Sequence, residues 1–308
     1  MVDEVPLYEF SGEGDILVLH IRKKGLSTWD MLEILAKFLG IKSREFGYAG
    51  LKDKNAQTKQ YISIHKNYEE KLESFEHDKI KILSKTYHNN KIKLGHLKGN
   101  RFFIRIKKVT PVAATKIANA LQNIKSFGMP NFFGFQRFGM NGDNYKKGED
   151  ILKNGKKEKN VKLKKMYINA YQSHLFNLWL SRRLELSTML TSFGVDELET
   201  LLNMPPHDIK ELQTQKHPFK LFSGDVMMHY PYGRLFHFEN ATEDVERFET
   251  RNISPTGLLC GQKSTKATSQ AHLIEKEFDD DINVDGARRY AWIFPEDVEG
   301  EYKEHEAG

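Results

Sequence analysis

The stretch DILVLHIRKKGLSTWDMLEILAKFLG, residues 15–40, carries the clearest structural pattern in the chain. Residues 16–23 alternate between two apolar-rich faces, which is typical of a largely buried strand. Ser27 with Asp30 three positions later indicates a helix N-cap of the capping-box type. Apolar residues at helical spacing follow, and Gly40 is a typical C-terminal stop. This stretch therefore predicts one strand followed by one amphipathic helix.

The same patterns predict further elements outward from this stretch. They are a strand over 59–65, two paired strands over 79–85 and 102–109 joined by a basic loop, a helix over 110–128, a helix over 166–186, helical pieces over 187–218, and a hairpin of 226–230 with 235–238. Because strands and helices alternate without a regular βαβ rhythm, we expect a mixed α+β fold rather than a doubly wound sheet.

Composition limits the class of protein. The 308 residues (35.8 kDa) suit two domains or one domain with a large insertion, and 39% hydrophobic with 29% charged residues suits a globular chain. No apolar run approaches the roughly 20 residues that span a bilayer, and no secretory signal is visible. A single cysteine, Cys260, excludes an intrachain disulfide and a multi-cysteine metal site. We expect a cytoplasmic protein with no membrane partner; the oligomeric state does not follow, and a monomer is our expectation.

The net charge of +5 is unevenly distributed. Residues 79–108 hold ten basic and no acidic residues, whereas residues 275–308 hold twelve acids and four bases, so residues 1–274 carry +13. An unbroken basic run is typical of a protein that binds a polyanion, and aromatic and amide side chains within this run favour RNA. The alternative is a solvated lysine-rich face.

Several familiar site patterns are absent from the sequence. It has no Gly-x-Gly-x-x-Gly after a strand, no phosphate-binding Gly-Lys-Ser/Thr loop, no His-Glu-x-x-His and no Gly-x-Ser-x-Gly. The twelve histidines form no cluster with carboxylates at metal-ligand spacing. We therefore expect neither a metal nor a cofactor.

Two polar loops remain as candidates for chemistry. In GYAGLKDKNAQT, residues 47–58, the one acid is Asp53, between two lysines that favour its ionised form, as a nucleophile requires. A lone aspartate in such a loop is more commonly a turn residue. In NFFGFQRFG, residues 131–139, four phenylalanines alternate with amide, arginine and glycine residues. Such a mixture suits a pocket that stacks a flat base and contacts its edge, or else a small aromatic core beneath a loop.

Five sequence blocks together resemble the signature motifs of the TruD family of tRNA pseudouridine synthases. They are AGLKDKNAQTKQ (49–60), KIKLGHLKGNRF (91–102), NFFGFQRFG (131–139), AYQSHLFN (170–177) and PTGLLCG (255–261). They occur in the family's order and span most of the chain. The combination is highly specific, although no single block is.

This resemblance implies a mixed-sheet pseudouridine synthase domain with an inserted α/β TRUD domain. It places the first part of the catalytic domain at 1–150, the inserted domain at 151–285 and the return to the catalytic domain at 286–308. It implies isomerisation of a uridine in tRNA, expected at position 13, with Asp53 as the nucleophile and no metal or cofactor. Asn131 is expected to contact the base, and we assign a stacking role to Phe133.

The same interpretation gives a set of residues that we expect to contact RNA. They are Lys52, Lys54, Lys91, Lys93, Lys98, Arg101 and Arg137. For Arg288 and Arg289, RNA contact and local salt bridging remain equally open.

Two features leave alternatives open. Members of the family usually carry a further segment ahead of the part that matches Val5-Pro6-Leu7 and a further block near the C-terminus, and no match to either is found here. We therefore expect a truncated catalytic domain. A non-catalytic RNA-binding protein on the same scaffold is thus the main alternative, and a glycosidase would need a second, suitably spaced carboxylate that these loops lack.

Overall fold

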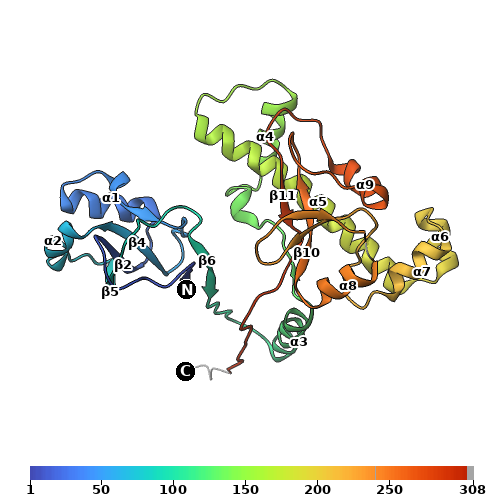
Figure 1. Cartoon of the computed structure of the whole chain (residues 1–308), viewed down its shortest axis with the longest axis horizontal. Coiled ribbons are helices and arrows are strands. Elements are labelled where there is room, and N and C mark those ends of the chain that lie inside the picture. The colour runs from blue at the N-terminus through green and yellow to red at the C-terminus, as the bar shows by residue number, and fades with distance from the viewer. Residues whose placement is uncertain (240, 304–308) are drawn as a thin grey trace. The chain divides into compact units, whose positions relative to one another are not determined.

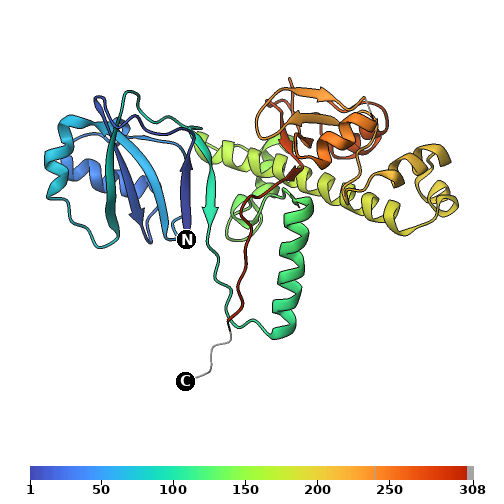
Figure 2. The same cartoon turned by 60° about the horizontal axis from the view of Figure 1, so that its bottom comes forward.

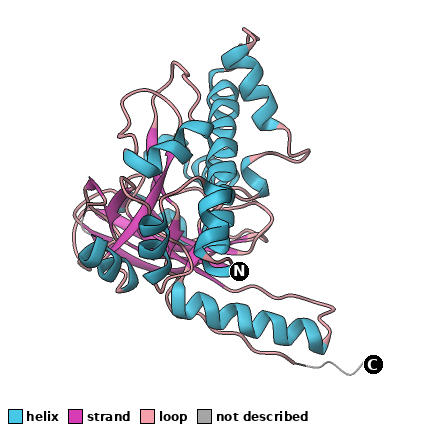
Figure 3. Ribbon diagram, turned by 90° about the vertical axis from the view of Figure 1, so that its right-hand side faces the viewer, coloured by secondary structure: helices cyan, strands magenta, loops and turns pink. Residues whose placement is uncertain are grey.

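The chain forms two compact units, Met1–Val109 and Thr110–Gly308, in a computed structural model that describes residues 1–239 and 241–303 (Figure 1). Each unit contains strands and helices, which Figure 3 distinguishes by colour, and the α+β fold class is confirmed. In the described residues no helix is long and apolar enough to cross a membrane.

The first unit is a mixed sheet with its helices. Its strands are β1 (Val2–Pro6), β2 (Ile16–Lys23), β3 (Gly47–Tyr48), β4 (Thr58–His65), β5 (Ile80–His88) and β6 (Leu97–Phe102), and its α-helices are α1 (Thr28–Leu39) and α2 (Glu69–Glu73). The strand order is β5-β2-β4-β1-β6, with β3 also paired to β4. Only the β1–β4 pair is parallel among the pairs of this sheet that the structure describes.

Alternation along β2 decides which side of the sheet becomes the core. Leu17, Leu19 and Ile21 are fully buried and belong to one cluster with the apolar face of α1. The predicted cap is confirmed: Ser27 and Asp30 form a capping box. The predicted stop is confirmed as well, because Gly40 has a φ of 73°, a left-handed conformation that glycine adopts without strain.

The predicted pairing of residues 79–85 with residues 102–109 is wrong. β5 pairs with β2 along its length and β6 pairs with β1, so the two strands lie at opposite edges of the sheet order. Residues 103–109 form no strand. Alternation reports which face of a strand is buried, but it carries no information about the neighbouring strand.

The second unit contains the remaining elements. They are α3 (Pro111–Phe127), β7 (Met129–Pro130), α4 (Asn144–Lys153), α5 (Val161–Ser192), α6 (Val195–Leu202), α7 (Pro206–Thr214), β8 (Val226–His229), β9 (Leu235–His237), α8 (Ala241–Glu249), β10 (Ile253–Leu259), α9 (Ser269–Glu275), β11 (Ala287–Tyr290) and β12 (Trp292–Ile293). One antiparallel sheet has the order β11-β10-β8-β9, and β12 pairs with β7. The predicted hairpin is confirmed as β8 and β9.

The long helix α5 packs on this antiparallel sheet. Phe176 and Trp179 of α5 share a core cluster with Met227 of β8 and Ile253 of β10. A Cβ at Gly257 of β10 would lie 2.3 Å from the Trp179 ring, so glycine is required for this close approach. The helix is longer than predicted at both ends, and its lysine-rich first turn lacks the apolar spacing on which the prediction of its start depended.

Helix α3 contrasts with α5, because none of its residues is buried. Its predicted start is confirmed: the Thr110 hydroxyl accepts from the amide of Ala113, with Pro111 in the first turn. Figure 2 shows the C-terminal segment running beside this helix, where a Cβ at Gly300 would lie 2.4 Å from Leu121 Cδ1.

The two compact units do not coincide with the domains that the family resemblance implies. Residues 110–150 pack with the second unit, since β7 pairs with β12 and α4 contacts α5. The domain boundaries 1–150, 151–285 and 286–308 are inferred from the family resemblance, not from contacts within the structure, and they stay a prediction. Residues 304–308 of the last one lie outside the described residues.

Candidate active site and RNA contacts

The loop that carries Asp53 joins β3 to β4, two antiparallel neighbours in the sheet. Its entrance is tightly packed: a Cβ at Gly47 would lie 2.3 Å from the carbonyl oxygen of Ile92. The amide of Gly95 donates to the carbonyl of Ala49 at 2.9 Å. The loop therefore begins from a fixed point against the segment that precedes β6.

Asp53 itself is exposed at the surface of the first unit. Its Oδ1 accepts from the amide of Asn55 at 3.0 Å, which is an Asx turn. Asp53 is therefore a turn residue, which is the alternative to a catalytic role that the sequence leaves open. The turn also fixes the carboxylate on its loop, so the two functions are compatible.

Lys23, the last residue of β2, anchors this loop from beneath and is not among the predicted site residues. Its side chain is fully buried, and Nζ donates to the carbonyls of Leu26 (2.6 Å), Asp53 (3.0 Å) and Lys52 (3.4 Å). Burial lowers the pKa of Lys23 to about 8, against the opposing effect of the Asp53 charge. The sequence contains a signal for it, because Lys23 continues the buried face of Leu17, Leu19 and Ile21.

Lys52 is buried, which is not the exposed position that a phosphate contact needs. Its Nζ pairs with Glu4 Oε2 at 2.5 Å, and its amide donates to Thr28 Oγ1 at 2.9 Å. Thr28 in turn donates to Gln60 Oε1 at 3.0 Å. These contacts connect the loop to β1, α1 and β4. In this fold Lys52 holds the loop, and Lys54 is the exposed lysine beside Asp53.

The other predicted RNA contacts of the first unit lie on β6 and the segment before it. Lys93, Lys98 and Arg101 are exposed. Lys91 is half-buried, and its Nζ donates to the carbonyl of Arg44 at 3.2 Å. Three cations are therefore presented to solvent on one segment of the chain.

Asn131 follows β7 in the second unit and is held by its side chain as well as its backbone. Its amide N–H donates to the carbonyl of Ala291, and Nδ2 donates to the carbonyl of Tyr290 at 2.9 Å. Arg289 Nη2 donates to Asn131 Oδ1 at 2.7 Å. These contacts fix the orientation of the carboxamide and leave it one N–H and one lone pair for a further partner.

Phe133 is half-buried and packs edge-on against Phe176 of α5, with ring centres 5.6 Å apart. Asn177 of α5 clamps its backbone: Oδ1 accepts from the Phe133 amide and Nδ2 donates to the Phe133 carbonyl, both at 2.9 Å. Phe133 therefore belongs to a small aromatic core beneath the loop, one of the two possibilities that the sequence offers. By contrast Phe135 is 94% exposed.

Two guanidinium groups lie against the Phe133 ring. The Cζ of Arg289 is 3.8 Å from the ring centre and that of Arg137 is 4.8 Å from it. Burial, followed by the nearby Arg137 charge, lowers the pKa of Arg289 to about 10. Sequence reasoning leaves Arg289 open between RNA contact and salt bridging; the structure gives it no carboxylate partner among the described residues.

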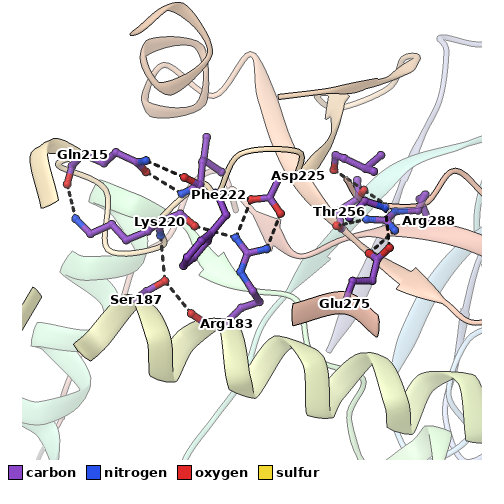
Figure 4. Close-up of polar contacts among 12 residues, drawn as sticks. Arg183, Ser187, Gln215, Lys220, Phe222, Asp225, Thr256, Glu275 and Arg288 are labelled. Atoms are coloured by element: carbon purple, nitrogen blue, oxygen red, sulfur yellow. Dashed lines mark hydrogen bonds and ion pairs between the residues drawn. The ribbon is translucent and has the colours of Figure 1, made fainter. Parts of the chain in front are cut away.

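Arg288, the neighbour of Arg289, belongs instead to a buried polar network of the second unit (Figure 4). It pairs with Glu275 at 2.5 Å and donates to Thr256. In a separate group of contacts in the same view, Arg183 of α5 donates to both carboxylate oxygens of Asp225, at 2.6 and 2.8 Å. These pairs attach α5 and α9 to the sheet, and each arginine is neutralised by a carboxylate of the protein itself.

The structure brings Asn131, Phe133 and Arg137 together within the second unit, where Arg289 and Asn177 join them. Asp53 and the predicted lysines belong to the first unit. Across the described residues, no group of three or more His, Cys, Asp or Glu side chains is arranged to hold a metal ion.

Comparison with known proteins places these motifs in a family. A family model described as tRNA pseudouridine synthase D (TruD) matches residues 1–162 and 157–303. The tRNA pseudouridine synthase D of Sulfurimonas denitrificans is 61% identical over 307 residues, covering 100% of this chain and 86% of that protein. That of a Nitratiruptor species is 55% identical with the same coverage.

A solved structure agrees at the level of the fold. The crystal structure assigned to tRNA pseudouridine synthase D (TruD) of Methanosarcina mazei matches 95% of this chain and 82% of that chain, with a TM-score of 0.65 and 18% identity. Together with the family model and the relatives above, this answers the question that the sequence motifs raised: the chain belongs to the TruD family of tRNA pseudouridine synthases.

Proposed function

We propose that this protein isomerises a uridine of tRNA, expected at position 13, to pseudouridine, with Asp53 as the nucleophile. The observation that carries the proposal is the Asp53 loop. It presents an exposed carboxylate on a turn that a buried lysine, Lys23, and a buried ion pair, Lys52 with Glu4, hold from below. Such a preorganised carboxylate is what nucleophilic attack at a sugar carbon requires.

The proposed reaction begins when the target uridine leaves its stack, at a cost of a few kcal/mol. A carboxylate oxygen of Asp53 bonds to C1′ of the ribose as the C1′–N1 bond breaks, and the electron pair passes to the uracil. The detached uracil turns, and its C5 bonds to C1′ as the carboxylate leaves. The C5 hydrogen departs as a proton while N1 takes one up, so the product is an isomer of the substrate.

Asn131 and Phe133 are proposed to hold the uracil during this turn. The Asn131 carboxamide retains one N–H and one lone pair, which complement the edge of a uracil. Stacking of a base on an aromatic ring contributes roughly 1–3 kcal/mol. The guanidinium carbons of Arg289 and Arg137 lie 3.8 and 4.8 Å from the centre of the Phe133 ring, so the uracil is expected to use the ring surface that these two groups leave uncovered.

Exposed cations are proposed to seat the tRNA backbone. Lys54, Lys93, Lys98 and Arg101 of the first unit and Arg137 of the second are the exposed members of the predicted set. Lysine and arginine contacts to phosphates give affinity and position rather than sequence readout. We infer that the protein meets this substrate in the cytoplasm.

The Asp53→Ala variant tests the proposal. We expect it to lose pseudouridine formation on a tRNA transcript, measured by site-specific mapping, while its affinity for the tRNA stays within about twofold, because a nucleophile contributes to the reaction more than to binding. Asp15→Ala, which removes an exposed carboxylate of the same unit, serves as the control. Undiminished turnover by the Asp53 variant would exclude this residue as the nucleophile.

The wild-type chain also separates this function from its main alternative. Binding of tRNA with no pseudouridine at any position would favour a non-catalytic RNA-binding protein. Pseudouridine at a position other than 13 would retain the reaction and correct the expected target.

A further inference from the structure

We propose that Arg137 and Arg289 form an anion site that grips a phosphodiester group of the RNA next to the target uridine. The proposal rests on the proposed function, since it takes tRNA as the ligand and deepens the account of how the base is held. It assigns to Arg289 a role that neither the motifs nor the comparisons give.

The first observation is that two like charges share one aromatic ring. The guanidinium carbons of Arg289 and Arg137 lie 3.8 and 4.8 Å from the centre of the Phe133 ring. The ring attracts each cation, but it supplies no net negative charge, and each guanidinium destabilises the other. Each cation therefore feels the charge of the other, and no carboxylate among the described residues lies within ion-pair distance of either to offset it.

The second observation is the contrast with four other arginines of the second unit. Arg182 pairs with Glu185, Arg183 with Asp225, Arg247 with Asp244 and Arg288 with Glu275. In the part of the chain that the structure describes, Arg137 and Arg289 have no carboxylate within ion-pair distance. Arg137 and Arg289 are therefore two cations without a carboxylate partner beside the ring on which the base is proposed to stack.

The third observation concerns the donors that remain on Arg289. Its Nε and Nη2 donate to the Asn131 carbonyl at 3.3 and 3.2 Å, and Nη2 also donates to Asn131 Oδ1 at 2.7 Å. Neither hydrogen of Nη1 is used in these contacts. Although burial lowers the pKa of Arg289 to about 10, the group keeps its charge near neutral pH.

These donors define the class of ligand. A guanidinium fork matches the oxygens of a phosphate, and two such forks can share one phosphodiester. Because Arg289 also orients the Asn131 carboxamide, the phosphate would lie close to the base that Asn131 contacts. Filling the site would thus couple recognition of the backbone to orientation of the uracil.

Variants that remove or retain the charge test the proposal in the full chain. Arg137→Gln is the cleaner change, because no hydrogen bond from its guanidinium to the described residues holds the fold. Arg289→Lys keeps the charge but loses the fork, and Arg289→Gln loses both. Arg182→Gln, which removes an arginine already paired with Glu185, is the matched control. Thermal unfolding of each variant establishes that it folds.

Affinity for a tRNA transcript is measured as a function of salt. We expect Arg137→Gln and Arg289→Gln each to weaken binding about tenfold. The slope of log Kd against log salt should fall by about one when both arginines are changed and by less in either single variant, because the two share one phosphate. Arg289→Lys should retain the slope while losing affinity, and Arg182→Gln should change neither. Wild-type affinity and slope in Arg137→Gln would overturn the proposal.

A modified substrate then identifies the phosphate. In a tRNA with a neutral methylphosphonate linkage on one side of the target uridine, we expect the wild type to lose about tenfold in affinity and the Arg137→Gln, Arg289→Gln double variant to lose nothing further. Equal losses in both proteins, at either linkage, would overturn the assignment. Pseudouridine formation by the wild type, measured in parallel, decides the proposed function separately, because its absence leaves the binding comparison intact.

Discussion

The ammonium of Lys23 has three hydrogens, and three main-chain carbonyls accept them. Two of these carbonyls belong to Lys52 and Asp53, so the charge fixes the backbone on which the proposed nucleophile stands. Burying a cation without a direct ion pair destabilises its charged form, and this lowers the pKa of Lys23. We infer that Lys23 positions the Asp53 loop without touching the substrate.

This arrangement predicts a pH dependence. The pKa of Lys23 falls from 10.5 to about 8, so activity that depends on its charge should decline as pH rises through 8. Stability should change in the opposite direction. Between pH 8 and 10.5 Lys23 is protonated in the unfolded chain but neutral in the folded one, so the free energy of unfolding should increase as pH rises through this range. The profile of kcat against pH on a tRNA transcript, with thermal unfolding beside it, measures both effects.

The Lys23→Met variant identifies the source of that decline. We expect kcat to fall at least about tenfold and the decline near pH 8 to disappear, while KM for tRNA stays within about twofold, because a buried side chain makes no RNA contact. Lys24→Met removes the exposed neighbouring charge and should behave as the wild type. A wild-type pH profile in the Lys23 variant would show that another group causes the decline.

Single residues also mark how far the sequence can be interpreted. Lys23 escapes prediction although it continues the alternation of β2, because a lysine at a strand end usually lies in solvent. For Lys52 the sequence predicts an RNA contact, and only the fold reveals that it forms a buried ion pair with Glu4. Arg288 and Arg289 are adjacent and chemically identical, but successive residues of a strand point to opposite faces of the sheet, so Arg288 meets Glu275 and Arg289 meets Asn131.

At the scale of elements, local signals predict the structure correctly and non-local ones do not. The capping box of α1 and the Thr110 cap of α3 depend on residues a few positions apart, and both are confirmed. The pairing of β5 with β2 and of β6 with β1 depends on residues far apart in sequence. The residue pattern within a strand does not determine which strand it pairs with, which is why the predicted β5–β6 pairing is wrong.

Helix α5 is the element that connects the core of the second unit to the proposed base contacts. Trp179 and Phe176 pack over Gly257, and Asn177 on the same helix clamps the backbone of Phe133. A displacement of α5 from the sheet would therefore reach the base contacts.

Gly257→Ala tests this coupling. Its Cβ would lie 2.3 Å from the Trp179 ring, and such overpacking typically costs about 1–3 kcal/mol. We expect a lower free energy of unfolding in urea and, at a temperature where the variant is folded, a reduced kcat. Gly99→Ala, where a Cβ meets nothing within 4 Å, is the control. Equal stability of the two variants would contradict the close packing of α5 on β10.

At the scale of the whole molecule, the charge pattern of the sequence predicts the dominant force in tRNA binding. Residues 1–274 carry +13 and residues 275–308 carry −8, so the mean of +5 understates the field that a polyanion meets. The cations expected to release counterions are the exposed ones on the β6 segment, Lys93, Lys98 and Arg101.

Replacing those three cations by glutamine should therefore reduce the salt dependence of tRNA binding by about 0.7–0.9 in log–log slope for each phosphate that the variant no longer neutralises. The change should affect KM far more than kcat, because these residues seat the backbone rather than act on the base. A control with Lys37, Lys71 and Lys210 changed to glutamine alters the net charge by the same amount at exposed positions of other elements. If both triple variants lowered the slope equally, net charge rather than the β6 segment would control binding; a drop confined to the first would place the RNA along that segment.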